Sequence, residues 1–400
     1  MLKNFIRMIP AVVIIAATIN TVSCKNNNGL LEQTNGPISS ASSTSSLIAT
    51  PTATATTAAA AVAFVTNFND GMVSSFTRNT STGALTHTGQ VQAGAKAGPR
   101  GVVASPNGSF VYVANINDDN IYEFSTNQTD GTLTPLATPS VSNGNATKPD
   151  ELAMNPAGTL LWVTGRAGTV AAYTVNTSTG QLTKKSSIDG FNTPFGIVVH
   201  PTLPVIYVSD LKTGLIQPLS YNTRSGLLSK NFTAVASSDP NAVMPTSLTI
   251  DPAGAALFAP DESNGEVSSF AIDGSGALTP SFVGTNSSVS DGPVGVGIGT
   301  NTGNEYVFTA NFGGASVSSF LVTNTTTVNA PATLASGYNA PKGLVVDPSG
   351  FVYTADSADG TVGVSTIKGG CGSQLCAGTT VPAESPHNAK SGPFGITLLH

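Results

Sequence analysis

The sequence predicts an all-β protein in which seven four-stranded sheets, the blades of a β-propeller, close into a ring. Its composition is the first reason. The 400 residues include 42 Gly and 25 Pro but only 10% charged residues, which favours many short strands joined by tight turns. The second reason is a motif that returns every 45 to 52 residues, a spacing that suits one four-stranded blade. The third is an incomplete copy at each end of the array, which a closed ring would join into one blade.

Each repeat opens with a proline-led strand of the pattern P-x-G-hydrophobic-x-hydrophobic, which we expect to be strand a, the innermost strand of a blade. Copies begin at Pro99, Pro149, Pro194, Pro245, Pro293 and Pro341, and a truncated copy, PFGITLLH, begins at Pro393.

An apolar strand, strand b, follows each proline-led strand and ends in a small or polar residue. Its copies read AFVTN (63–67), VYVAN (111–115), LWVTG (161–165), IYVSD (206–210), LFAP (257–260), VFTAN (307–311) and VYTAD (352–356). The first copy has no proline-led strand before it, and the strand at 393–400 has no strand b after it. Pairing these two completes a seventh blade and removes a weak seam. The propeller therefore spans residues 61–400.

Turn residues separate the remaining strands. Gly, Asn and Asp accept a positive φ and occupy the expected b–c hairpins, as in NDDNI (117–121) and ADGTV (358–362). The c–d connections carry STGALT (81–86), STGQLT (178–183) and similar segments. The sixth blade has TNTTTVN (323–329) instead, without the glycine, so its outer strand is the least regular.

The strand-b endings, with P-x-G before them and G-x-L after, resemble the YVTN and lactonase-like β-propeller family, whose superfamily includes propellers similar to 6-phosphogluconolactonase. The resemblance covers residues 62–400 and implies a seven-bladed fold. It also implies that enzymes of this type place His, Arg and Glu side chains in the channel, where they polarise an ester and activate water. The fold by itself does not define the function, because propellers host binding modules and enzymes alike.

The d–a connections and b–c hairpins of a propeller share one face, at the mouth of the channel. The residues after the strand-a prolines should ring this mouth. The charged and aromatic candidates there are Arg100, Asp150, Glu151, Lys342, Phe195 and Phe394. No histidine is expected at the mouth, so a lactonase would have to use Arg100, Lys342 and the carboxylates of Asp150 or Glu151.

Polar residues at the ends of strand b should stand close to the same mouth. They are Asn67, Asn115, Asp210, Asp261, Asn311 and Asp356. Their aspartates, with Asp150 and Glu151, could bind Ca²⁺, which prefers hard oxygen ligands. Alternatively, these side chains hydrogen-bond their own hairpins. The residue type recurs in most blades whatever its neighbours, which favours the structural interpretation and predicts no metal or other cofactor.

The first 60 residues predict export and a tether. A basic start, the short apolar stretch Ala11–Ile19 and TVSC at its end are typical of a secretory signal peptide, residues 1–23. The Ser23–Cys24 junction resembles the lipobox of bacterial lipoproteins, in which Cys24 would carry palmitate, although Thr21 stands where Leu is usual. An ordinary signal peptide with an incidental cysteine is the alternative. Residues 24–60 are rich in Ser, Thr and Ala and predict a flexible tether.

Two further cysteines, Cys371 and Cys376, lie in GGCGSQLCAG. They are close enough to form a disulfide in an oxidising compartment. Zinc is the alternative, but a second Cys/His pair that would complete such a site is missing nearby.

Charge and anchoring together suggest a first hypothesis for function. The net charge is −6 and the Lys and Arg residues do not cluster, which argues against nucleic acid and against direct electrostatic membrane binding. We expect a monomeric propeller, lipid-anchored on the extracytoplasmic side of a bacterial cell envelope, that binds a protein or glycan partner through its variable loops. The alternative is a lactone hydrolase with its site in the channel.

Overall fold

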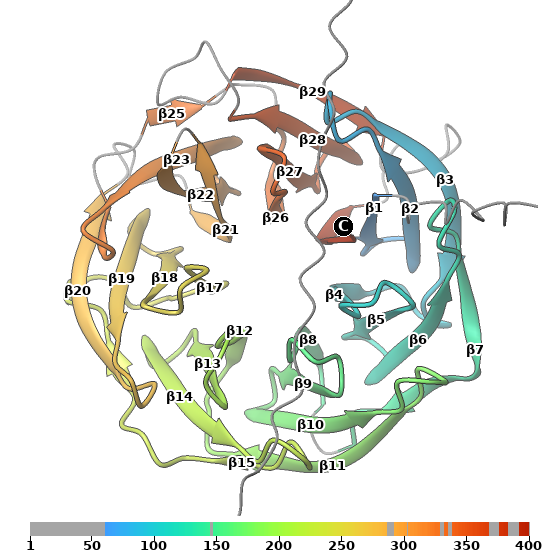
Figure 1. Cartoon of the computed structure of the whole chain (residues 1–400), viewed down its shortest axis with the longest axis horizontal. Coiled ribbons are helices and arrows are strands. Elements are labelled where there is room, and N and C mark those ends of the chain that lie inside the picture. Colours follow the sequence, from blue (N-terminus) through green and yellow to red (C-terminus); the bar gives the residue numbers. More distant parts are fainter. Residues whose placement is uncertain are drawn as a thin grey trace, which may run out of the picture. The chain divides into compact units, whose positions relative to one another are not determined.

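The computed structural model describes residues 61–144, 147–285, 292–301, 303–328, 332–334, 338–367, 376–382 and 392–399. They all belong to the second of the two units into which the chain divides, Thr56–His400. Their strands form seven separate sheets arranged around a common centre (Figure 1). The described residues contain no helix, and therefore no helix that could cross a membrane. The predicted seven-bladed β-propeller is confirmed.

Every blade runs from an innermost strand a to an outermost strand d. The a strands are β30 (Pro393–Leu399), β4 (Pro99–Ala104), β8 (Pro149–Met154), β12 (Pro194–Val199), β17 (Thr249–Ile250), β21 (Pro293–Asn301) and β26 (Pro341–Val346). The b strands are β1 (Val62–Asn67), β5 (Phe110–Asn115), β9 (Leu160–Gly165), β13 (Val205–Asp210), β18 (Ala256–Asp261), β22 (Asn304–Asn311) and β27 (Phe351–Asp356).

The outer half of each blade follows in the same blade order. The c strands are β2 (Met72–Arg78), β6 (Asn120–Thr126), β10 (Thr169–Val175), β14 (Leu215–Tyr221), β19 (Glu266–Ile272), β23 (Ser316–Thr323) and β28 (Thr361–Thr366). The d strands are β3 (Leu85–Gln92), β7 (Leu133–Ser142), β11 (Leu182–Asp189), the pair β15 (Leu228–Ser229) and β16 (Val235–Ala236), β20 (Leu278–Thr285), the pair β24 (Thr327–Val328) and β25 (Ala332–Leu334), and β29 (Cys376–Pro382).

Strand b is apolar at nearly every position because both faces of a blade are buried. In β5, Val111 and Val113 pack in a cluster with the first blade, whereas Tyr112 packs in a cluster with the third. Alternate side chains point to opposite faces of a sheet, so one strand serves two interfaces. Each of the seven hydrophobic clusters of the described residues joins two neighbouring blades in this way.

The aromatic residue of the strand-b signature ties its blade to the next one. The Tyr112 hydroxyl donates a hydrogen bond to the carbonyl of Gly180, 2.7 Å away in the c–d turn of the following blade. Gly180 has a φ of 77°, which suits glycine. Equivalent bonds join Trp162 to Gly226, Tyr207 to Gly276 and Tyr353 to Gly83. The aromatic and the glycine of the two repeated motifs are thus partners.

The outer strand is broken in two blades, only one of which was anticipated. The sixth blade has β24 and β25, as the missing glycine suggested. In the fourth blade strand d is also divided, which the sequence did not indicate. There β15 pairs with Ser220 and Tyr221 and β16 with Leu215 and Ile216, which leaves a gap centred on Pro218. Proline has no N–H to donate to a ladder, and the gap falls where the c–d ladders of the first, second, third and fifth blades also shift register.

The ring closes as predicted. Strand β30 pairs antiparallel with β1, and Val62 lies opposite Leu399. A buried ion pair strengthens the same junction, because Arg78 at the end of β2 contacts Asp347, which follows β26 of the last blade. Arg78 also donates a hydrogen bond to the Leu399 carbonyl, 3.0 Å away.

Glycine in the P-x-G motif has a steric cause. In five blades an added Cβ at this position would lie under 3.0 Å from the backbone carbonyl of the next inner strand, closer than real Cβ atoms come. These glycines are Gly101, Gly196, Gly295, Gly343 and Gly395. The third and fifth blades carry Glu151 and Ser247 instead. Only there, among the seven copies, does the inner strand present a side chain at this position.

Candidate active site

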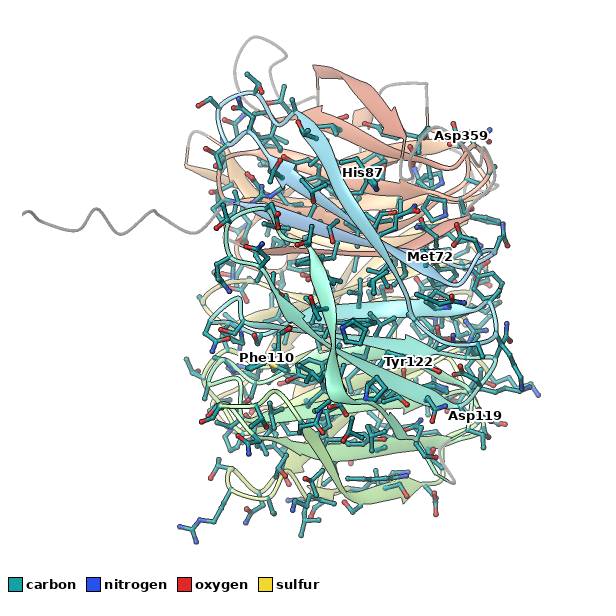
Figure 2. The ribbon with its side chains drawn as sticks, turned by 90° about the vertical axis from the view of Figure 1, so that its right-hand side faces the viewer. Met72, His87, Phe110, Asp119, Tyr122 and Asp359 are labelled. Atoms are coloured by element: carbon teal, nitrogen blue, oxygen red, sulfur yellow. The ribbon has the colours of Figure 1, made fainter. Side chains whose placement is uncertain are left out.

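The face where the b strands end gathers two rings of side chains. In Figure 2, Asp119 and Asp359, from two b–c hairpins, and Met72, the first residue of β2, lie toward one side of the ring, and Phe110, at the start of a b strand, lies toward the other. The inner ring consists of the residues after the strand-a prolines: Arg100, Asp150, Phe195, Thr246, Val294, Lys342 and Phe394. The outer ring consists of the residues that directly follow strand b: Phe68, Ile116, Arg166, Leu211, Glu262, Phe312 and Ser357.

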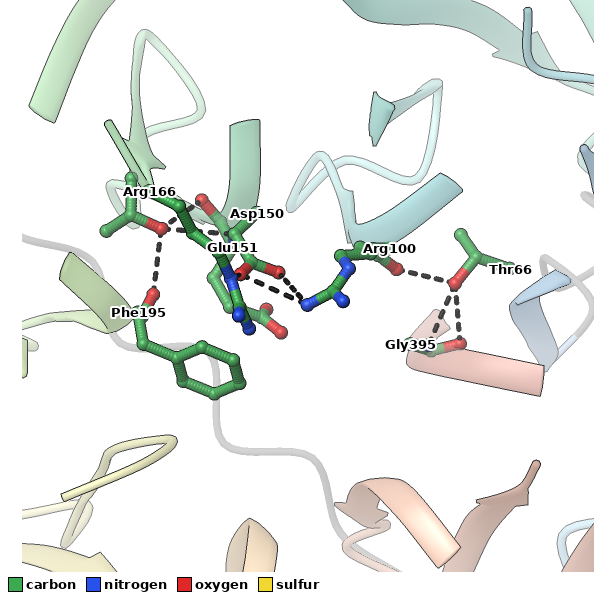
Figure 3. Close-up of polar contacts among 8 residues, drawn as sticks. Thr66, Arg100, Asp150, Glu151, Arg166, Phe195 and Gly395 are labelled. Carbon is green, nitrogen blue, oxygen red and sulfur yellow. Dashed lines mark hydrogen bonds and ion pairs between the residues drawn. The ribbon is translucent and has the colours of Figure 1, made fainter. Parts of the chain in front are cut away.

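The carboxylate of Asp150 forms ion pairs with two arginines at this mouth (Figure 3). The Asp150 side chain is fully buried and accepts hydrogen bonds from Arg100 Nη1 at 3.1 and 3.3 Å. Its second oxygen also pairs with Arg166 Nε. Charge-assisted bonds of this kind hold a guanidinium in a defined direction. Each arginine keeps further N–H groups that Asp150 does not use, and these remain for a ligand.

Glu151 is the second carboxyl of this group, and its pKa differs strongly from that of a free glutamate. It lies half-buried beside Arg100 and Arg166, with its side chain directed toward the same space (Figure 3). Burial, followed by repulsion from Asp150, raises its pKa to about 8, although the two arginines oppose the shift. A carboxyl that titrates near neutral pH can move a proton in either direction.

A third cation, Lys342, approaches from the seventh blade. Its Nζ lies 4.9 Å from the ring centroids of both Phe312 and Phe394, and no carboxylate of the described residues forms an ion pair with it. Burial, Arg100 and Arg166 all lower its pKa. Phe394 also lies under the Arg100 guanidinium, 4.4 Å away. Three cations, Arg100, Arg166 and Lys342, thus face the mouth together with the carboxyl groups of Asp150 and Glu151.

The remaining members add a carboxyl and two aromatic faces. Glu262 is half-buried, and burial raises its pKa while Arg166 and Lys342 lower it. Phe195 lies 4.9 Å below the Arg166 guanidinium. Phe68 lies 5.4 Å from the Arg100 guanidinium. Aromatic faces of this kind can stack against the C–H groups of a ring-shaped ligand.

A cavity of about 140 Å³ continues from this mouth into the channel. Polar and charged side chains line its upper part, with Glu151, Ser247 and Lys342 among them. The wall also contains four P-x-G glycines, which hold the same repeat position as Glu151 and Ser247, and aliphatic side chains such as Val102 and Leu248. The cavity therefore places a small ligand against Glu151.

The structure brings together all six mouth residues named from the sequence: Arg100, Asp150, Glu151, Lys342, Phe195 and Phe394. Sequence reasoning missed Arg166, Glu262, Phe68 and Phe312. All four directly follow a strand-b signature, so the position after that signature could have identified them as mouth residues. Neither described histidine is at the mouth: His87 lies on β3, and His200 follows β12, where its Nε2 is 2.9 Å from the Gly254 carbonyl.

Several polar residues that end strand b hold the turns around the mouth. Asp210 accepts hydrogen bonds from the backbone N–H groups of Thr193, just before β12, and of Lys212, in the hairpin between β13 and β14. Asn115 accepts one from Asn117 N–H and donates to the carbonyls of Ala93 and Lys96. Asp261 accepts from the N–H groups of Met244 and Ser263.

The other three members of this set bond to side chains. Asn67 donates to Ser74, and Asn311 donates to Ser316 and Ser318. Asp356 accepts a hydrogen bond from Thr354, and burial raises its pKa to about 8. Within the described residues no group of three His, Cys, Asp or Glu side chains is arranged to hold a metal ion.

The predicted signal peptide, Cys24 and the tether lie outside the described residues, and so does Cys371. Cys376 begins β29, where only the backbone is described.

Fold and mouth together define a class: a seven-bladed propeller whose channel mouth carries arginine, lysine and carboxyl side chains. The chain belongs to the lactonase family of seven-bladed β-propellers, whose model matches residues 16–148 and 205–343. No curated protein matches the chain.

Solved structures of similar fold include proteins named for lactone hydrolysis. One, from Bacteroides uniformis, is provisionally assigned as a 6-phosphogluconolactonase; it is 16% identical over 85% of this chain and 99% of its own, with a TM-score of 0.71. Another is the periplasmic gluconolactonase of Pseudomonas aeruginosa, 15% identical over 85% of this chain and 99% of its own, with a TM-score of 0.68. At these identities the likeness concerns the fold.

Proposed function

We propose that the protein is a lactone hydrolase whose active site is the channel mouth around Glu151. The observation that carries this proposal is Glu151 itself: it replaces the repeat's glycine, lines the cavity and has a pKa of about 8 beside two arginines. Membership of the lactonase family supports the same conclusion. The comparisons favour this function over the envelope-binding module that tether and composition first suggested, and envelope location stays a prediction.

The geometry suggests a role for each residue in the hydrolysis of the lactone. A lactone carbonyl directed toward Arg100 and Arg166 would meet N–H donors that stabilise the oxyanion formed when water attacks. Ionised Glu151 takes the proton of that water and returns it to the ring oxygen as the C–O bond breaks. Water and lactone thus give one hydroxy acid, with no other reactant. Lys342 and the Phe68, Phe312 and Phe394 rings hold the rest of the substrate.

The substrate class follows from the same surroundings. The cations suit an oxygen-rich or anionic lactone, and the aromatic rings suit the C–H face of a saturated ring. We therefore propose a sugar lactone, the kind of compound for which the two structural neighbours are named.

Turnover of glucono-δ-lactone as a function of pH tests the proposal, after subtraction of the uncatalysed hydrolysis. The base must be ionised, so kcat/KM should rise with pH and level off above a midpoint of about 8. Glu151→Gln should lower kcat/KM at the plateau by at least about 100-fold and remove this rise. Glu305→Gln is the matched control, because Glu305 is also half-buried with a raised pKa but is the second residue of β22, at the opposite end of strand b from the mouth. Full activity in Glu151→Gln would refute the proposal.

A further inference from the structure

Ser247 is the second residue that replaces the P-x-G glycine of the inner strands. Five of the seven copies have glycine at this position because the next strand leaves no room for a Cβ. One exception is Glu151, which the proposed mechanism uses. The other is Ser247, in the segment between Pro245 and β17 of the fifth blade, which no step of that mechanism requires.

Both exceptions face the same space. Ser247 and Glu151 line one cavity, and the blade between them contributes Gly196 and Phe195 to its wall. Gly196 itself packs against the Thr246 carbonyl and the Ser247 Cα, which leave no room for a Cβ, so it adds no side chain to the cavity between Glu151 and Ser247. The two side chains thus flank a single glycine position, one blade away on either side.

The backbone of Ser247 is held in place, whereas its hydroxyl has no hydrogen-bond partner among the described residues. Its backbone N–H donates to the Val294 carbonyl at 3.3 Å. The preceding residue, Thr246, donates its hydroxyl to the carbonyls of Pro260 and Pro293, at 3.1 and 3.2 Å, so the segment is fastened to its own blade and to the next. In the part of the chain that the structure describes, the Ser247 hydroxyl makes no hydrogen bond. A hydroxyl that lines a cavity on a fixed backbone and has no partner is available to a ligand.

We propose that Ser247 is a specificity-determining residue that hydrogen-bonds a ring hydroxyl of the lactone while its carbonyl lies against Glu151. This inference rests on the proposed function. A site built to bond a substrate hydroxyl discriminates against the analogue that lacks it, because the site's polar group is then left unpaired. Ser247 therefore selects polyhydroxylated lactones over unsubstituted ones of the same ring size.

The test compares two six-membered lactones, glucono-δ-lactone and δ-valerolactone, which has no hydroxyl groups. The readout is the ratio of their kcat/KM values for the full-length protein and its variants. Ser247→Ala removes the hydroxyl, and Ser247→Gly installs the residue that most blades have. We expect both variants to lower the ratio by about 3- to 10-fold, the effect of losing one hydrogen bond between uncharged groups. The control is Ser178→Ala, at an exposed serine in the c–d turn of the third blade, which should leave the ratio as it is.

Each outcome decides a different point. A wild-type protein that hydrolyses neither lactone refutes the proposed function, and this inference with it. Wild-type turnover with an unchanged ratio in Ser247→Ala and Ser247→Gly refutes the inference alone. An equal loss on both lactones, together with a lower thermal midpoint, would show a structural role for Ser247 and refute the specificity role as well.

Discussion

The ion pair between Arg78 and Asp347 makes a sharp prediction about ring closure. It joins the first and last blades, and the two side chains are 0% and 1% exposed. We expect Arg78→Met, which keeps the length and apolar stem of the side chain, to lower the free energy of unfolding by about 3–5 kcal/mol. The cause is the charge left behind: the Asp347 carboxylate stays buried without its cation, and the Leu399 carbonyl loses a donor.

A second substitution separates this cause from a general loss of packing. Asp347 Oδ1 also accepts a hydrogen bond from Phe351 N–H, at 3.4 Å. In the third blade Asn155 accepts two such bonds at the equivalent position, so asparagine suits this turn. Adding Asp347→Asn to Arg78→Met removes the unpaired charge but keeps the turn, and should recover most of the lost stability.

Urea unfolding followed by the fluorescence of the single tryptophan, Trp162, measures these differences. Arg224→Met is the control, because Arg224 lies in an exposed turn and its removal should change stability by less than about 0.5 kcal/mol. Amide hydrogen exchange adds a local measure: Arg78→Met should speed exchange along β30 more than along the equivalent strand β8. A loss as small as that of Arg224→Met, or a double variant no more stable than Arg78→Met, would refute the reasoning.

Two further predictions concern the inner strands and the turns before them. Gly295→Ala should cost about 1–3 kcal/mol in urea unfolding, since its Cβ would collide with the Lys342 carbonyl; Gly274→Ala, with nothing within 4 Å, is the neutral control, and equal stability of the two variants would contradict the steric account. Ala340→Gly should raise stability by about 0.5–1 kcal/mol, because Ala340 has a φ of 53°, a conformation that strains any residue with a Cβ. Ala358→Gly, in an exposed turn without positive φ, should instead lower stability, and a destabilised Ala340→Gly variant would show that the turn is not strained.

The repeat made the fold predictable, because each repeated residue has a repeated physical task. The P-x-G glycine lets inner strands approach, and the aromatic of strand b bonds the glycine of the next c–d turn. Features without a repeat could not be found this way. Arg78 and Asp347 are 269 residues apart in the chain, and each occurs once. The break in the outer strand of the fourth blade, opposite Pro218, also occurs once in this form, and the pattern of apolar residues does not reveal it.

The candidate site was predictable in its inner ring only. Arg100, Asp150 and Lys342 stand at a position that the proline of each repeat marks. Arg166 and Glu262 stand one residue beyond the strand-b signature, where the chain leaves the sheet and its residue type varies freely between blades. The elevated pKa of Glu151 needed the structure, since it depends on burial and on Asp150 rather than on residue type.

In a repeat protein, a position where one repeat differs from the residue that the other repeats share can indicate the functional site. Inner strands that pack too closely for a Cβ impose glycine, so a larger residue at that position requires the wall of the channel to be arranged differently there. The chain does this twice, at Glu151 and Ser247, and both side chains enter one cavity on either side of Gly196. Neither side chain adds to the apolar clusters between the blades. Binding and chemistry in the channel are tasks that glycine could not perform, and they account for both departures together.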